Sequence, residues 1–227
     1  MKLLLTISAL ALSLTVVTAQ QQTSEDEVKR ITDAATILDE IMAAGDKAIP
    51  RAILERAQGI AVFPALIKGN VLVGGQRGHG VLSVRDASGA WSAPGFLTLT
   101  GGSLGPQLGL HAIDLVLVIN NRRGLEQLVK NQFKLGAEAG IAAGPLGREA
   151  TAQTDIQMRA KILGYSRARG LFAGVTLNGS TVREDRDANK RFYGTALRTG
   201  DIVFKGMGSG PEPVLAAWRD TLVKHAK

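Results

Sequence analysis

The apolar positions of the chain follow a helical period before residue 59 and a strand-like period after it. Between residues 23 and 44 they recur every three or four positions, which predicts a helix with one apolar face. The members of that face are Val28, Ile31, Ala35, Leu38 and Met42. A second, short helix is predicted over residues 50–58. Two environments suit the apolar face of the first helix, the protein core and a membrane surface. The acidic polar face at residues 25–27 and 39–40 favours the core.

Beyond residue 59, short apolar runs alternate with glycine-rich and Asx turns, which is the pattern of an antiparallel meander. The predicted strands cover residues 60–64, 70–74, 80–85, 96–100, 112–119, 171–177 and 201–205. A helix is predicted from about Asn121 through Phe133, and a last helix from about Pro213. The glycine clusters at 74–80 and 101–105 lack the strand-to-helix context of a phosphate loop and predict tight turns and bulges. The predicted fold class is α+β: an antiparallel, barrel-like or strongly curved β-sheet with N-terminal helices and a C-terminal helix packed on it.

The first nineteen residues have the pattern of a signal peptide. Lys2 precedes an apolar run over residues 3–16, and the small residues 17–19 form a cleavage site. Cleavage leaves residues 20–227 as a single domain with its core at about 44–205, and a retained membrane anchor is the alternative. The chain has no cysteine, which excludes a lipoprotein anchor and a disulfide. We therefore expect an exported protein, periplasmic or secreted, that can lie peripherally at a membrane.

The charge balance points to acidic partners. The formal net charge is +7 and the basic residues are spread along the chain. Such a balance favours phospholipid headgroups, nucleic acid or anionic wall polymers. Nucleic acid is the least available of these to an exported protein, and aromatic residues are only 4% of the chain, too few for a base-stacking surface. No nucleic-acid partner is expected.

Three basic pairs suggest an anion-binding surface. One pair follows Asn121, where a strand gives way to a helix and free backbone donors are available. A second pair stands at the entrance of the apolar run over residues 171–177, and a third flanks the first hairpin. Any one of these residues alone is most simply a solvated surface residue. The predicted headgroup-binding residues are Arg167, Arg169, Arg122, Arg123, Lys68 and Arg77.

Other chemistry is weakly supported. Asp185, Asp187 and Asn189 match the first ligand positions of a calcium loop, but Lys190 and Ala196 stand where glycine and glutamate are required. A capped, solvated turn is the preferred interpretation of this charged segment, with an irregular cation site as the alternative.

The three histidines, His79, His111 and His225, lack metal-ligand spacing, so no metal or cofactor is expected. An enzyme would use Asp114 or Asp185 as its acid or base, yet no spacing supports one. The sequence predicts a protein that is not an enzyme.

Several separate segments closely resemble the SYLF domain, also known as the Ysc84-type actin-binding or lipid-binding domain. The segments are AQGIAVFP, GGQRGHGV, SGAWSAPGF, YSRARGLFAGVTLNGS and DANKRFYG, in the order of the family, over roughly residues 44–194. The resemblance implies a binding domain. Eukaryotic members bind phosphoinositide membranes, some members bind or bundle actin, and bacterial members are typically exported and regarded as lipid-binding. Two features depart from the family pattern: the missing lipobox cysteine and the acidic start of the N-terminal helix.

The resulting expectation is a bacterial, exported domain that binds anionic phospholipid peripherally through basic residues. The expected lipids carry phosphatidylglycerol, cardiolipin or phosphoinositide-like headgroups. Actin enters only by family analogy and is not expected here. The alternative is a structural or protein-interaction module of the cell envelope, whose basic surface binds a protein or an anionic wall polymer.

Overall fold

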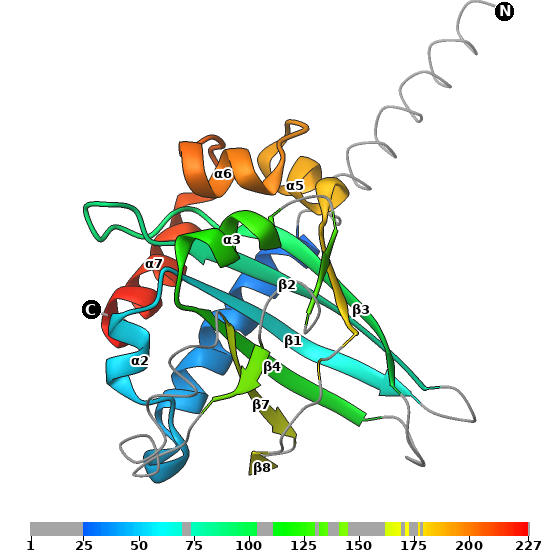
Figure 1. The fold of residues 1–227 in the computed structure, drawn as a ribbon. Helices are drawn as coiled ribbons and strands as arrows, with labels where there is room; N and C mark the ends of the chain where they lie inside the picture. Colours follow the sequence, from blue (N-terminus) through cyan, green and yellow to red (C-terminus); the bar gives the residue numbers. More distant parts are fainter. Residues whose placement is uncertain are drawn as a thin grey trace, which may run out of the picture.

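A computed structural model describes residues 25–69, 74–103, 111–129, 132–135, 141–144, 162–168, 171–172, 177 and 179–226. The predicted signal peptide and Arg169 lie outside these residues. Within them, nine strands form one sheet in the order β5-β9-β3-β2-β1-β4-β7-β6, with β8 pairing to β7. All neighbours are antiparallel except β6 and β7, which run parallel. Figure 1 shows a strongly twisted sheet with helices packed on it, so the predicted α+β class is confirmed.

The elements have the following bounds. The strands are β1 (Gly59–Gly69), β2 (Gly74–Val84), β3 (Gly95–Ser103), β4 (His111–Ile119), β5 (Phe133–Lys134), β6 (Ile141–Ala143), β7 (Ile162–Ala168), β8 (Leu171–Phe172) and β9 (Thr181–Glu184). The helices are an N-terminal helix over residues 25–42, η1 (Gly45–Lys47), α2 (Arg51–Glu55), α3 (Arg122–Leu128), α5 (Arg186–Tyr193), α6 (Thr199–Lys205) and α7 (Glu212–His225). No helix in these ranges is long and apolar enough to span a membrane.

The N-terminal helix packs on the core, as its polar face predicted. Ile31, Ala34, Leu38 and Ile41 are fully buried, whereas the outer members of the predicted stripe are only partly buried. The buried face is therefore rotated slightly from the predicted one. Glu27, which was predicted on the solvent side, is also fully buried. The same sheet face carries α7, where the Trp218 Nε1–H donates to Ser83 Oγ over 2.8 Å.

β1 does not end at Pro64, which corrects the predicted boundary. The pairing of β1 with β4 shifts by one residue between Phe63 and Leu66, which marks a β-bulge. Ala65 in this bulge has a φ of 48°, and its N–H donates to Asp114 Oδ1 over 3.1 Å. Proline is tolerated inside a strand at such a bulge, because the regular ladder is interrupted there.

The glycine cluster at 74–80 is a strand rather than the predicted turn. It forms the first half of β2, and the cluster at 101–103 likewise ends β3. The glycines serve close packing: a Cβ on Gly78 would lie 2.6 Å from Leu66 Cδ1, and one on Gly80 would lie 2.5 Å from Phe63 Cδ1. The side chains of Phe63 and Leu66 in β1 therefore occupy the space that side chains at positions 78 and 80 of β2 would otherwise fill.

Two further predictions were wrong. Residues 201–205 form the end of helix α6 instead of a strand; Asp201 and Lys205 pair at 2.7 Å across one helical turn, and Gly206 ends the helix with a φ of 66°. Phe133 lies in β5 and not in the helix that begins at Arg122. In the 171–177 run, β8 folds back on β7, Leu177 is buried, and residues 173–176 lie outside the described residues.

Candidate functional site

Arg167 is neutralised within the fold. Its Nη2 donates to Asp114 Oδ2 over 3.0 Å and also to Glu40 of the N-terminal helix, and its side chain is 20% exposed. Burial alone would lower the pKa of Arg167, but the hydrogen bonds to both carboxylates raise it above its usual value. The guanidinium therefore ties the N-terminal helix to β4 and β7. The structure gives this predicted headgroup residue a structural role.

Arg122 and Arg123 lie at the opposite end of β4 from Arg167. They begin α3 directly after the strand, whereas Arg167 pairs with Asp114 in the register of β4. Five residues of extended strand separate Asp114 from Ile119, which is about 17 Å. The Arg122 Nε lies 3.5 Å from Glu126, and its guanidinium stacks 4.4 Å over the Phe204 ring. Arg123 is exposed. The structure therefore places the Arg122–Arg123 pair and Arg167 at opposite ends of β4, so they do not form one shared surface.

Arg77 belongs to a different group, which we call the basic strip: Arg77, His79, Arg183 and Lys134. These residues lie on one sheet face in two cross-strand rows. Arg77 of β2 is aligned with Lys134 of β5 through the threonines at positions 100 and 181. His79 of β2 is aligned with Arg183 of β9 through Thr98. Neighbouring strands lie about 4.8 Å apart, so a row from β2 to β5 spans about 14 Å.

The permanent charges of the basic strip are open to solvent. Arg77, Lys134 and Arg183 are exposed, and the threonines between them are half-buried. Among the residues that the structure describes, no carboxylate forms an ion pair with these three side chains, in contrast to Arg167. Lys68 of β1, another predicted site residue, pairs in register with Gln76, whereas Arg77 pairs with Ile67, so the strand register does not align Lys68 with Arg77.

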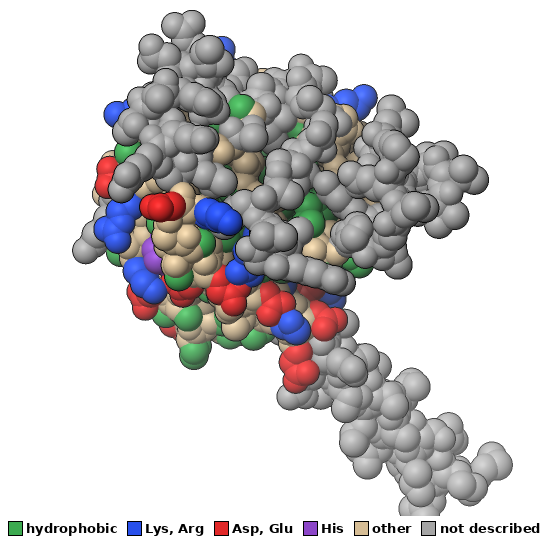
Figure 2. All heavy atoms as spheres, turned by 90° about the horizontal axis from the view of Figure 1, so that it is seen from below, with side chains coloured by type: hydrophobic (Ala, Val, Ile, Leu, Met, Phe, Trp, Pro, Cys, Tyr) green, Lys and Arg blue, Asp and Glu red, His purple; other side chains and the backbone are tan. Residues whose placement is uncertain are grey.

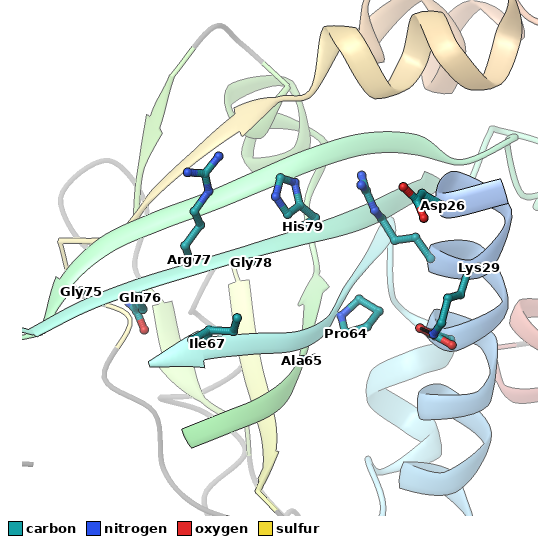
Figure 3. A pocket seen from close by; sticks show the side chains of 12 residues that line it. Asp26, Lys29, Pro64, Ala65, Ile67, Gly75, Gln76, Arg77, Gly78 and His79 are labelled. Carbon is teal, nitrogen blue, oxygen red and sulfur yellow. Dashed lines mark hydrogen bonds and ion pairs between the residues drawn. The ribbon is translucent and has the colours of Figure 1, made fainter. Parts of the chain in front are cut away.

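A groove of about 700 Å³ borders the basic strip. It lies between the first turns of the N-terminal helix and the paired strands β1 and β2, and Figure 3 shows its walls. Arg77 and His79 point to the same side of β2, whereas Gln76 points to the opposite side. Ile67 of β1 lies in the groove and is 55% exposed. The groove thus places an exposed apolar side chain next to unpaired positive charge.

Asp185 anchors the inner end of the basic strip. Its Oδ1 accepts the Ala188 N–H over 3.1 Å and so caps α5, while its Oδ2 lies 3.3 Å from His79 Nδ1 and 3.4 Å from Arg30 Nη1. Burial alone would raise the pKa of Asp185, but hydrogen bonds from His79 and Ala188 and the charge of Arg30 bring it well below its usual value. Asp185 is therefore an ionised acceptor: the predicted cap is confirmed, but the side chain is only 13% exposed and so is not solvated.

The chain is similar to a known protein family over more than half of its length. The family model described as "Ysc84: Las17-binding protein actin regulator" matches residues 100–224. The chain belongs to the Ysc84 family. The predicted resemblance is confirmed, and the family's description names a binding protein and not an enzyme.

Curated relatives extend this match. SH3 domain-containing YSC84-like protein 1 of Homo sapiens is 36% identical over 172 residues, which are 75% of this chain and 49% of that protein. LAS seventeen-binding protein 3 of Saccharomyces cerevisiae (strain ATCC 204508 / S288c) is 36% identical over 172 residues, 74% of this chain and 37% of that protein. This Ysc84-family chain therefore spans about half the length, or less, of the relatives it matches.

Carboxylates of the N-terminal helix neutralise other basic residues of this Ysc84 domain. The fully buried Glu27 accepts from Arg191 Nη2 over 2.7 Å, and Asp39 lies 2.8 Å from Lys224 Nζ and 2.6 Å from His225 Nε2. Figure 2 shows a face on which acidic and basic side chains are intermixed. Three members of the acidic face, Glu27, Asp39 and Glu40, thus hold the helix to the rest of the fold, whereas Glu25 and Asp26 are exposed as predicted.

The carboxylates considered as acid, base or cation ligand have structural partners. Asp114 accepts from Ala65 N–H and from Arg167, and Asp185 accepts at both oxygens. Within the described ranges, no three His, Asp or Glu side chains gather as a metal site would require.

Sequence reasoning missed three members of the basic strip. Arg183 stands in the short strand over residues 181–184, Lys134 in the two-residue strand β5, and His79 in a glycine-rich segment that is typical of a turn. The alternation of polar and apolar residues at Thr181, Val182 and Arg183 was a readable signal for Arg183. Nothing in the sequence indicated that β9 lies between β5 and β3.

Proposed function

We propose that this Ysc84-family domain binds anionic phospholipid peripherally, with the basic strip facing the lipid headgroups. The observation that supports the proposal best is the alignment of Arg77, Arg183 and Lys134 on one open sheet face without carboxylate partners among the described residues. The three charges lie on neighbouring strands of one exposed sheet face, so they can approach a lipid surface together. Ile67, exposed at the border of the strip, adds an apolar contact.

The strength of such binding follows from the number of charges. Each Lys or Arg near an anionic membrane contributes about 1 kcal/mol, and the contribution falls off within a Debye length. The three permanent charges of the strip therefore contribute about 3 kcal/mol, which is roughly 150-fold in affinity. Binding should be strong at low salt and much weaker at physiological ionic strength.

Phosphatidylglycerol and cardiolipin vesicles are the probes of choice, with phosphatidylcholine vesicles as the neutral control. A chain from Gln20 onward contains every helix and strand that the structure describes, so it suits the assay. We expect co-sedimentation with the anionic vesicles, weakened by added salt, and none with phosphatidylcholine.

A matched pair of triple variants locates the binding surface. The strip variant carries Arg77→Gln, Arg183→Gln and Lys134→Gln. The control carries Lys47→Gln, Arg51→Gln and Lys190→Gln, which are also exposed and lower the net charge by the same three units. The strip variant should lose on the order of 100-fold in affinity and the control only a few-fold. Equal losses in the two variants would show that net charge, and not the strip, governs binding.

Binding to an acidic protein surface is the second candidate. It is favoured by the family description, which names an actin regulator, and by the names of the relatives, one of which is a LAS seventeen-binding protein. The same basic strip would then meet acidic side chains. Absence of vesicle binding at low salt, together with strip-dependent co-sedimentation with actin filaments, would favour this candidate over lipid.

Export is part of the proposal. Its support is the signal-peptide pattern of residues 1–19. Expression of the full chain in a bacterial host should yield a mature N-terminus at Gln20 in the periplasmic or secreted fraction. An intact N-terminus in the cytosol would contradict export without affecting the lipid proposal.

A further inference from the structure

We propose that His79 is a proton-dependent phosphate ligand in the groove beside the basic strip. When doubly protonated, His79 donates from Nε2 to a phosphate oxygen of a lipid headgroup that the Arg77 guanidinium also binds. The inference rests on the proposed function and adds a regulation to it: lipid binding takes up one proton and strengthens as the pH falls.

The hydrogen bonds around the ring fix its tautomer. His79 Nδ1 lies 3.3 Å from Asp185 Oδ2 and 3.4 Å from Thr98 Oγ1, and the Thr98 hydroxyl donates to the same carboxylate oxygen over 3.3 Å. An ionised carboxylate can only accept hydrogen bonds. The hydrogen of the neutral ring must therefore sit on Nδ1, between the ring and Asp185.

This tautomer makes the neutral ring a poor anion ligand. With its hydrogen on Nδ1, neutral His79 presents a lone pair at Nε2, which repels a phosphate oxygen. A second proton turns Nε2 into a charged donor, and hydrogen bonds from a charged donor to phosphate are among the strongest in proteins. The ring therefore changes from repelling an anion to binding it.

The open side of the ring faces the place where such an anion would sit. The His79 side chain is 43% exposed and lines the groove, and no described residue hydrogen-bonds its Nε2. Arg77 stands two residues away and points to the same side of β2 (Figure 3). Two strand residues span about 7 Å, a separation that one phosphate group bridges between an imidazole and a long guanidinium side chain.

The charges around His79 come from several elements. Asp185 at the start of α5 lies 3.3 Å from His79 Nδ1, and Arg30 on the N-terminal helix lies 3.4 Å from the same carboxylate oxygen. The remaining charged groups on the groove walls and the adjacent row are Arg77, Arg183, Asp26, Lys29 and Asp33, of which Lys29 and Asp33 pair with each other at 2.6 Å. A bound phosphate adds one negative charge on the open side of the ring and so favours the second proton.

The size of the effect follows from linkage. Uptake of one proton on binding changes affinity by up to about tenfold per pH unit while the imidazole titrates, which for histidine falls between about pH 5 and 8. Phosphatidylglycerol is the right probe, because its phosphodiester keeps a single negative charge over this range, whereas a phosphomonoester would itself titrate near pH 6. Any pH dependence then belongs to the protein.

The test measures binding to phosphatidylglycerol vesicles at pH 8.0 and pH 5.5 and constant low ionic strength, for three proteins. Wild type should bind at least tenfold more tightly at pH 5.5. His79→Gln should bind with nearly equal affinity at both pH values, because its amide offers a donor that does not titrate. The control His225→Gln, whose ring pairs with Asp39 on another part of the fold, should keep the wild-type pH dependence.

The outcomes separate this inference from the proposed function. Equal wild-type binding at the two pH values, or a pH dependence that survives in His79→Gln, overturns the role of His79 and leaves lipid binding intact. No wild-type binding at either pH overturns both. Nitrogen chemical shifts of the ring at pH 8.0 give an independent check: a hydrogen on Nε2 instead of Nδ1 would contradict the tautomer on which the inference depends.

Discussion

Replacement of Gly80 by alanine should strongly destabilise the domain. An added Cβ would lie 2.5 Å from the Val62 carbonyl oxygen and 2.5 Å from Phe63 Cδ1. Both distances are shorter than any normal contact of a Cβ atom. The carbonyl oxygen belongs to the backbone of β1, whose position is fixed by pairing with β2 and β4, so neither atom can move away cheaply.

The same strand supplies graded controls. A Cβ on Gly75 would meet nothing closer than 3.9 Å, and a Cβ on Gly78 would meet mainly the flexible end of Leu66 at 2.6 Å. Overpacking a core costs about 1–3 kcal/mol, and we place Gly80→Ala at the upper end because backbone is involved. Gly75→Ala should instead be neutral or stabilise by up to about 1 kcal/mol, because alanine restricts the unfolded chain.

Urea unfolding followed by tryptophan fluorescence measures the difference, since Trp91 and Trp218 are both buried. A gap of about 3 kcal/mol between Gly80→Ala and Gly75→Ala corresponds to a midpoint shift of about 1 M or more at typical m-values for urea. Gly78→Ala should fall between them. If Gly80→Ala were as stable as Gly75→Ala, the glycine-rich segment would not pack against β1 as described, and its interpretation as a strand would fail.

Two other substitutions test the ion pairs. Arg167→Gln should cost about 1 kcal/mol in urea unfolding, because the carboxylates it leaves unpaired are partly exposed, and vesicle binding should be unchanged. A large loss of lipid affinity would return Arg167 to the binding surface. The lowered pKa of Asp185 means that its contribution to stability is present above the ordinary carboxyl range and is lost as the pH falls below about 4. Asp185→Asn keeps a helix cap, so it should destabilise clearly at pH 7 and less near pH 2; an equal loss at both pH values would argue against an ionised Asp185.

Periodicity predicted the elements that have a single strong pattern. The N-terminal helix, the helix capped by Asn121, β4 and the C-terminal helix all follow from local spacing and capping residues. The prediction failed where local preference and tertiary packing disagree. Residues 201–205 carry three apolar residues in a row, which is typical of a strand, but Ile202 and Val203 are both buried on the inner side of a helix that ends at a glycine.

The segment at 74–80 failed for the opposite reason. Glycine in a strand is locally unfavourable, so its frequency there indicated a turn. The reason for glycine at these positions lies in the neighbouring strand β1, where Phe63 and Leu66 fill the space above β2. No pattern within residues 74–80 contains that information, because it depends on the register between two strands.

The N-terminal helix decides which basic residues of this sheet face are paired and which stay open to solvent. Arg77 and Arg167 both stand in strands and on the same sheet face, and their sequence surroundings gave no reason to treat them differently. The helix lays Glu40 against Arg167 near its C-terminal end, whereas beside Arg77 its first turns leave an open groove. The strand order then brings Arg183 and Lys134 to the side of Arg77 that the helix leaves uncovered. A cation becomes available for a ligand where the fold supplies no carboxylate for it, and that condition depends on long-range packing that a single strand sequence does not encode.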